Sequence, residues 1–286
     1  MIVRAGHSPA RHRRRAVLAG LLACLILVTG CTLNAGTGFA DEFGGYLDTR
    51  ADVDSHRVQG NNDLPGTGSA DSRVQLRAGL TDPELAAAIS EIATHRADQQ
   101  IAHHNLTVAF PAENGSGGEA VVSVFLRLGD GALGDTSPAA LETRIGQVRE
   151  FAAADPALVE LSATVSDLHA STTGDPFVTA GALTDYLRTE PPGVQRATAR
   201  SGAPGSLGVV SFDVGDPIDA LRPMVAILGV LPAGTVPRRW RASSQRPFTA
   251  PQFELDLPRG TDPAVLEAAR QQAAALGVPL RALIAK

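Results

Sequence analysis

The stretch Val74–Glu84, with the sequence VQLRAGLTDPE, predicts a strand followed directly by a helix. Apolar and polar residues alternate from Val74 to Ala78, which is the period of a half-buried β-strand. Thr81 and Glu84 stand three residues apart, as in a capping box in which each side chain satisfies a backbone amide at the helix start. Apolar residues then continue at helical spacing, so we expect this helix to run to about residue 99.

Two further strands, a second helix and a closing strand are predicted downstream of this stretch. They occupy residues 104–110, 120–128, 137–153 and 158–165, which gives residues 73–168 the order β-α-β-β-α-β. Residues 169–206 are rich in Gly, Pro, Thr and Ser, which is typical of a linker, and one short helix is expected at 180–188.

The same order returns in residues 207–286. Strands are expected at 207–214, 235–242, 248–257 and 278–284, and helices at 216–228 and 261–277. An Asp-Pro pair opens a predicted helix in both copies, at Asp82-Pro83, Asp216-Pro217 and Asp262-Pro263. This recurrence indicates a weak internal repeat.

Two copies of β-α-β-β-α-β resemble tandem ferredoxin-like domains, an α+β fold in which two helices cover one face of a four-stranded antiparallel sheet. The resemblance is one of element order over residues 73–286, without a sequence motif. It implies one domain at 73–168 and another at 207–286. It also implies that the first and third strands of each domain are central and that the second and fourth lie at the edges.

The amino terminus has the pattern of an exported chain. Five arginines and no acid precede an apolar run of about 14 residues, which is shorter than the roughly 20 residues that a membrane-spanning helix needs. This run ends in Leu27-Val28-Thr29-Gly30-Cys31, which resembles the lipobox of bacterial lipoproteins. Val28 departs from that pattern, because Leu is most frequent at its position.

Membership of that family implies that residues 1–30 are a signal peptide and that Cys31 carries a lipid anchor. The thiol of Cys31 would receive a diacylglyceryl group, and its amine, freed by cleavage, would often receive a further acyl chain such as palmitate. Two or more chains hold a protein stably on a membrane, whereas one chain binds reversibly. Residues 31–72 are then expected to form the lipidated cysteine and a flexible tether, with one helical turn around Phe39–Leu47.

Alternatives exist for these amino-terminal residues. Cys31 could be a buried thiol or half of a disulfide, and Arg14-Arg15 loosely resembles a twin-arginine export signal. Arginine supplies all the positive charge except that of Lys286, and together with the Ala, Gly and Pro content this is typical of a GC-rich bacterium such as an actinobacterium.

Charge limits the class of partner. The sequence has 25 basic and 30 acidic residues, and removal of residues 1–30 would leave a net charge of about −10. Nucleic-acid binding requires clustered Lys or Arg that neutralise phosphates, so no nucleic-acid partner is expected.

No cofactor, metal site or catalytic set is predicted. Residues 129–134 match G-x-G-x-x-G, but the strand before them lies inside a domain and acidic residues occupy the place of a pyrophosphate. His103 and His104 are neighbours on a strand and point to opposite faces, so they cannot easily share a metal ion. These two residues and His95 are interpreted as surface histidines. Asp213 and Asp219 are interpreted as ordinary exposed acids.

Arg238, Arg239, Trp240 and Arg241 form the one concentrated cationic and aromatic segment. Trp and Arg dominate binding hot spots, so this segment is the candidate partner-binding surface. Alternatively, it is an edge strand protected by charge. Arg239 and Arg241 are expected to face Glu254 and Asp256 on the neighbouring strand, on the side of the sheet away from the helices.

The leading hypothesis is therefore a non-enzymatic interaction module, anchored by lipid on the extracytoplasmic side of the cell membrane. Its partner would be an envelope protein or a cell-wall component. The alternatives are an envelope hydrolase or metal-dependent enzyme with an unrecognised site, and a carrier for a small ligand.

Overall fold

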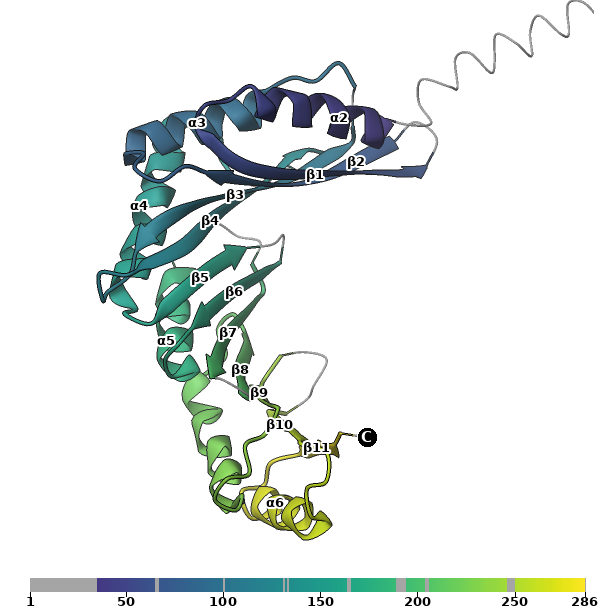
Figure 1. Cartoon of the computed structure of the whole chain (residues 1–286), viewed down its shortest axis with the longest axis vertical. Helices are drawn as coiled ribbons and strands as arrows, with labels where there is room; N and C mark the ends of the chain where they lie inside the picture. Colours follow the sequence, from purple (N-terminus) through teal and green to yellow (C-terminus); the bar gives the residue numbers. More distant parts are fainter. Residues whose placement is uncertain are drawn as a thin grey trace, which may run out of the picture.

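A single mixed sheet with eleven strands organises the part of the chain that the structure describes (Figure 1). The computed structural model describes residues 35–64, 67–99, 101–130, 132, 134–163, 166–188, 194–203, 206–245 and 250–285. Its strands and helices together confirm the predicted α+β class.

The strands follow one another in the sheet in chain order. They are β1 (Val53–Leu64), β2 (Thr67–Leu76), β3 (His103–Glu113), β4 (Glu119–Gly129), β5 (Leu158–Ala163), β6 (Asp167–Thr172), β7 (Arg196–Ala203), β8 (Ser206–Asp213), β9 (Arg239–Ser243), β10 (Gln252–Leu257) and β11 (Leu280–Ile284). The helices are α2 (Ala35–Asp48), α3 (Asp82–Thr94), α4 (Pro138–Ala154), α5 (Pro176–Leu187) and α6 (Pro263–Ala275), with 3₁₀ helices η1 (Ile218–Ala220) and η2 (Arg222–Val230).

The sheet is built from a repeated unit of one hairpin and one helical crossover. The antiparallel pairs are β1–β2, β3–β4, β5–β6, β7–β8 and β9–β10. Each hairpin is joined through a helical segment to a strand that pairs in parallel with its predecessor, as in β2–β3 and β10–β11. Parallel neighbours need such a crossover, whereas antiparallel neighbours need only a short turn.

This topology does not confirm the two tandem ferredoxin-like domains. The predicted element order is present from β2 to β5, but β2 and β4, expected to be adjacent and central, are separated by β3. The same holds for β8 to β11. Every crossover returns to the neighbouring position in the sheet instead of skipping one, and element order alone does not distinguish these two connections.

The segment expected to be a linker also belongs to the sheet. Residues 169–206 contain most of β6, the helix α5 and the strand β7. β7 pairs with β6 on one side and with β8 on the other. The short helix predicted at 180–188 is real, but it begins at Pro176, where Asp175 caps it by accepting a hydrogen bond from the Phe177 backbone amide.

The predicted tether is likewise mostly ordered, whereas Cys31 and the lipobox lie outside the described residues. Phe39, Phe43 and Leu47 recur at a four-residue spacing on α2 and are buried against β1 and β2. The start of α2 lies very close to the hairpin, because a Cβ atom at Gly60 would overlap the backbone carbonyl of Gly36. Only glycine permits this approach.

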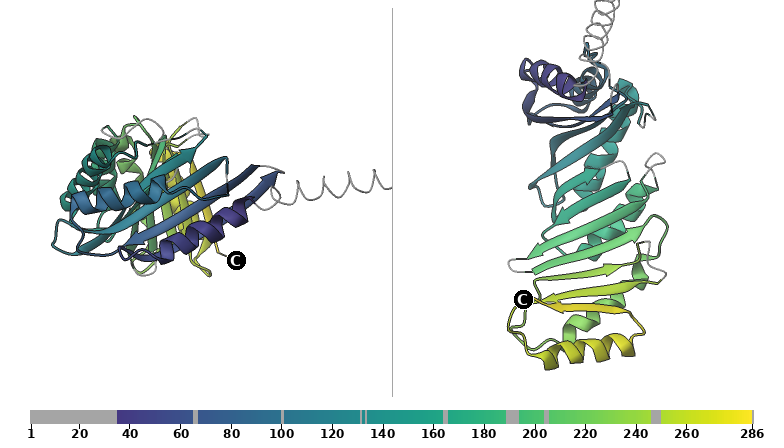
Figure 2. Two further views of the ribbon diagram at one scale, coloured as in Figure 1. Left: turned by 90° about the horizontal axis from the view of Figure 1, so that it is seen from above. Right: turned by 90° about the vertical axis from the view of Figure 1, so that its right-hand side faces the viewer.

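The helices of the described residues cover one face of the sheet and leave the other bare. In Figure 1, α2 and α3 lie above β1 and β2, α4 and α5 lie along the central strands, and α6 lies at the far end, so the helices follow the outside of a curved sheet. Figure 2 shows the same arrangement of sheet and helices from two further directions. The core lies between the two layers and includes the fully buried rings of Phe110, Phe212 and Phe253. No helix among the described residues has the length and apolar character needed to cross a bilayer.

Candidate functional site: the bare face of the sheet

The face of the sheet that no helix covers is strongly polar. Successive side chains of a strand alternate between the two faces, and cross-strand partners share a face. The pairing registers therefore place one set of charged residues on this bare face: Arg57, Arg73, Arg127, Arg196, Arg200, Arg239, Arg241 and Arg281, with Asp71, Glu160, Asp167, Asp213, Glu254 and Asp256. A surface of this composition suits a partner with charged and hydrogen-bonding groups.

Ion pairs occupy the carboxyl-terminal part of this face. The prediction that Arg239 and Arg241 face Glu254 and Asp256 on the neighbouring strand is confirmed, and Arg239 lies opposite Asp256, with 3.0 Å between the guanidinium and the carboxylate. Arg241 lies opposite Glu254, but its guanidinium donates a 2.7 Å hydrogen bond to the amide oxygen of Gln245. Burial lowers the pKa of Arg241, and the charge of Glu254 opposes that shift.

The predicted Trp–Arg surface is not contiguous. Trp240 points to the helix side, where its ring stacks at 6.3 Å from Phe177 and 6.1 Å from Phe253. Gly208 on the neighbouring strand β8 lies opposite Trp240, and a Cβ atom there would come within 2.6 Å of the indole. The backbone of β8 therefore packs closely against the Trp240 ring. Trp240 is therefore partly buried and packs against the core, whereas Arg239 and Arg241 remain on the bare face and Arg238 is exposed just before β9.

The alternative interpretation of this segment is wrong as well. β9 pairs with β8 on one side and with β10 on the other, so it is an internal strand. Its arginines do not protect an open edge. Arg239 and Arg241 instead lie within the bare face, between strands on both sides.

A histidine marks the centre of the bare face. His169 on β6 lies opposite Ser162 and Thr198, and both neighbouring strands supply charged residues. Burial lowers the pKa of His169, and the positive charge of Arg200 lowers it further. Beside it, burial acts to raise the pKa of Asp167, but hydrogen bonds from Ser166 and Arg196 outweigh burial and keep that pKa below its ordinary value.

The amino-terminal end of the bare face contains a groove of about 340 Å³. Arg57 on β1 and Arg73 on β2 are direct cross-strand partners, and both are exposed. Asn105 on β3 donates a 2.9 Å hydrogen bond to Asp71, which fixes that amide beside the arginines. The sequence did not reveal this groove, because two of its strands fall in or next to the segment assigned to a tether.

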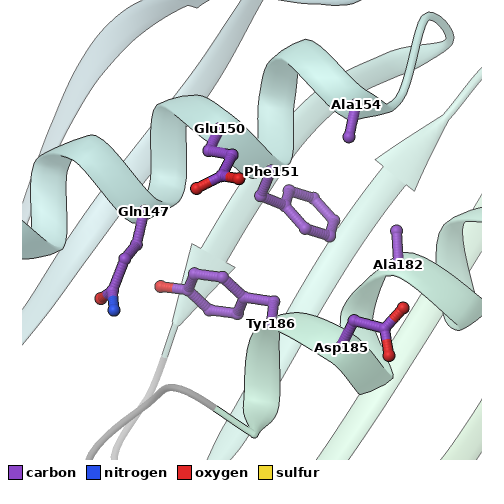
Figure 3. A pocket seen from close by; sticks show the side chains of 7 residues that line it. All are labelled: Gln147, Glu150, Phe151, Ala154, Ala182, Asp185 and Tyr186. Atoms are coloured by element: carbon purple, nitrogen blue, oxygen red, sulfur yellow. The ribbon is translucent and has the colours of Figure 1, made fainter.

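A second cavity, of about 360 Å³, lies between α4 and α5 (Figure 3). Phe151 and Tyr186 meet there edge to face, with 5.6 Å between ring centroids, and Glu150 and Asp185 project from opposite helices. All its lining residues come from α4 or α5. This cavity therefore belongs to the helix layer and does not form part of the bare face.

The histidines and acids singled out in the sequence are placed apart from one another. His104 is buried against Phe39 and Phe43, so the surface interpretation is wrong for it, whereas His95 stacks on Tyr46 at 3.7 Å. Asp213 is also buried rather than exposed. The described residues contain no group of three or more His, Cys, Asp or Glu placed to hold a metal ion. Two positions of the G-x-G-x-x-G match, residues 131 and 133, lie outside the described part of the chain.

Comparison with protein-family models gives no match, and comparison with curated proteins gives no related sequence. The functional conclusion therefore depends on the bare face and on the amino-terminal segment.

Proposed function

We propose that this chain is a lipoprotein anchored through Cys31 on the extracytoplasmic side of the cell membrane, where it acts as a non-enzymatic binding module. Its partner is an envelope protein or a cell-wall component, and the bare face of the sheet is the binding surface. Nucleic acid is not a partner, because the mature chain has a net charge of about −10.

One observation carries the proposal: hairpin-and-helix units stack into a curved sheet whose inner face has no helical cover. Stacked repeats of this kind create extended concave surfaces that many repeat proteins use for binding. The face is rich in arginine, whose planar guanidinium recognises carboxylates and phosphates through paired hydrogen bonds. This supports a partner that carries anionic groups.

The anchor is tested by Cys31→Ser. The wild-type chain is expected in the membrane fraction and to be released only by detergent, because two or three acyl chains hold it there. The variant is expected to lose this detergent requirement and to lack the lipid mass in intact-protein mass spectrometry. An unchanged fractionation and an unchanged mass would contradict the anchor.

The binding surface is tested by charge reversal at the centre of the bare face. Arg200 is exposed on β7, so Arg200→Glu is expected to leave the fold intact and to reduce partner recovery in a pull-down from detergent-solubilised envelope by about tenfold. Arg259→Glu changes the same charge in an exposed turn after β10, and it should recover the partner as the wild type does. Equal recovery with both variants would remove the bare face from the proposal.

A further inference from the structure

We propose that the groove at the amino-terminal end of the bare face binds a phosphate group between Arg57 and Arg73. The inference rests on the proposed binding role of this face, and it adds the chemical class of one ligand group. Nothing in the sequence pattern pointed to these residues.

The two arginines form an unfavourable pair in the absence of a ligand. Arg57 and Arg73 are direct partners in the β1–β2 register, and side chains so placed have Cβ atoms about 4.5–5.5 Å apart. Like charges directly opposite one another destabilise a hairpin. Other arginines of the bare face, such as Arg196 and Arg239, each have a carboxylate partner. No described residue forms an ion pair or a side-chain hydrogen bond with Arg57 or Arg73.

The surroundings of the pair fit a small polar anion. Gln59, Asn105 and Thr107 also line the groove and supply hydrogen-bonding groups. Asp71 is the one acid in the lining, and its two carboxylate oxygens accept hydrogen bonds from Asn61 at 3.1 Å and Asn105 at 2.9 Å. These bonds engage both carboxylate oxygens of Asp71, so this acid is paired with two amides and not with either arginine.

Charge balance favours phosphate over carboxylate. A phosphate monoester carries about −1.5 to −2 charges at pH 7, which matches two guanidinium groups. A carboxylate carries one charge and would leave one positive charge of the pair unbalanced. Arginine also binds phosphate oxygens through two parallel hydrogen bonds, so each side chain can hold a separate edge of the group.

Two sources of phosphate are available to an anchored chain. Cys31 lies four positions before the start of α2 at Ala35, a span of at most about 14 Å. A chain lipidated at Cys31 therefore keeps its first repeat unit close to the membrane surface, where a headgroup such as that of phosphatidic acid carries a phosphate monoester. The same groove is open to a free phosphate compound.

Thermal unfolding of the full chain in nonionic detergent tests the site. Potassium phosphate at pH 7 is expected to raise the unfolding temperature by about 3–6 °C at tenfold excess over its dissociation constant, relative to chloride or acetate at equal ionic strength. Arg57→Gln and Arg73→Gln should lose this shift, yet be at least as stable as wild type in chloride because the repulsion is gone. Arg239→Gln, from an ion pair on the same face, should keep the shift.

The source is assigned by repeating the measurement in micelles of dihexanoylphosphatidic acid, whose headgroup is a phosphate monoester. Stabilisation there that Arg57→Gln abolishes identifies a headgroup, whereas a response to inorganic phosphate alone identifies a soluble compound. An equal shift with acetate, a shift retained in both groove variants, or no shift in either medium would overturn the inference. Loss of the phosphate site would leave the Arg200→Glu pull-down result unaffected, so the two proposals fail separately.

Discussion

Phe43→Ala is expected to lower the free energy of unfolding by about 3–5 kcal/mol, as removal of a buried aromatic ring does when the cavity cannot collapse. The Phe43 side chain is fully buried. Its ring lies 5.3 Å from that of Phe39 and 4.9 Å from that of His104, so it joins α2 to β3. Urea denaturation of the full chain, followed by circular dichroism in nonionic detergent, measures this change.

Gly45→Ala provides a control of opposite sign on the same helix. Gly45 is exposed, and no atom lies within 4 Å of the position that a Cβ atom would take. Replacement of a helical glycine by alanine is expected to raise the free energy of unfolding by about 0.5–1 kcal/mol. If residues 35–48 were a flexible tether, both substitutions would be neutral, and that result would exclude α2 from the folded body.

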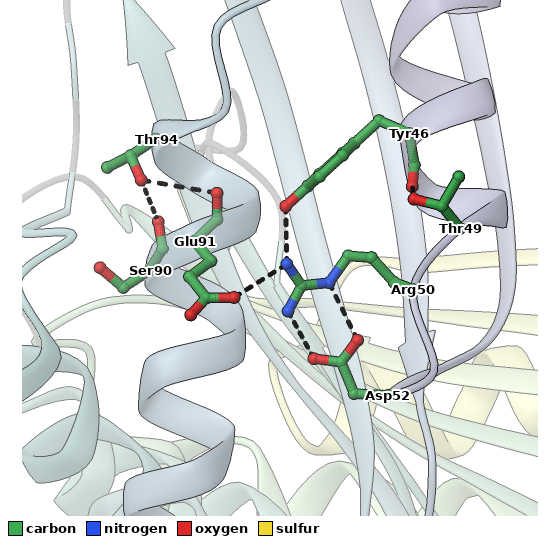
Figure 4. Close-up of polar contacts among 7 residues, drawn as sticks. All are labelled: Tyr46, Thr49, Arg50, Asp52, Ser90, Glu91 and Thr94. Atoms are coloured by element: carbon green, nitrogen blue, oxygen red, sulfur yellow. Dashed lines mark hydrogen bonds and ion pairs between the residues drawn. The ribbon is translucent and has the colours of Figure 1, made fainter.

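The first unit consists of α2 and the β1–β2 hairpin. Polar contacts reinforce the expectation that this first unit is part of the folded body (Figure 4). Arg50, in the turn between α2 and β1, donates hydrogen bonds to the Tyr46 hydroxyl at 2.6 Å, to Asp52 at 2.9 Å and to Glu91 of α3 at 3.0 Å. The hydrogen bond from Arg50 holds the pKa of Asp52 below its ordinary value. Arg50 thereby connects α2, β1 and α3 through one side chain.

Local structure could be predicted from the sequence because its signals are local. Glu84 accepts a 2.8 Å hydrogen bond from the backbone amide of Thr81, which is the reciprocal bond expected of the capping box. Asp262 caps α6 by accepting from the Ala264 amide. Strand pairing could not be predicted in the same way, because a crossover to the adjacent strand and one that skips a strand present the same order of elements.

The first unit was missed for a different reason. β1 and β2 are rich in Asn, Asp, Gln, Ser and Gly, because one of their faces is bare and because glycine is required where α2 lies on the hairpin. Such a composition is also typical of loops. The spacing of Phe39, Phe43 and Leu47 was the available signal, and it indicates a full amphipathic helix rather than one turn.

Part of the candidate site could be predicted from the alternation of side chains between the two faces of a strand. The sequence correctly predicted that Arg239 and Arg241 face Glu254 and Asp256, whereas the register that places Arg239 opposite Asp256 comes from the structure. The same alternation requires Trp240, between two outward arginines, to point into the helix layer. A Trp–Arg surface on one strand was therefore excluded by the sequence itself. The arginine pair of β1 and β2 required knowledge of the hairpin.

Acidification from pH 6.5 to about 4.5 is expected to destabilise the fold through His104. Its ring is buried between Phe39 and Phe43 of α2, and its Nε2 atom lies 2.7 Å from the Ser72 hydroxyl. Burial lowers the pKa of His104 from 6.5 to about 4, opposed only in part by the charge of Asp71. Between these values the unfolded chain binds the proton and the folded chain does not, so stability falls as the pH falls.

The size of the effect follows from the same shift. Each pH unit in this interval removes about 1.4 kcal/mol, so about 2–3 kcal/mol is lost by pH 4.5. The free energy of unfolding from urea curves at several pH values gives the slope. His104→Gln keeps a polar partner for Ser72 without a titrating ring and should flatten the slope, whereas His103→Gln, on the bare face beside it, should not. A slope unchanged by His104→Gln would contradict the assignment, and it would mean that other groups cause the acid sensitivity.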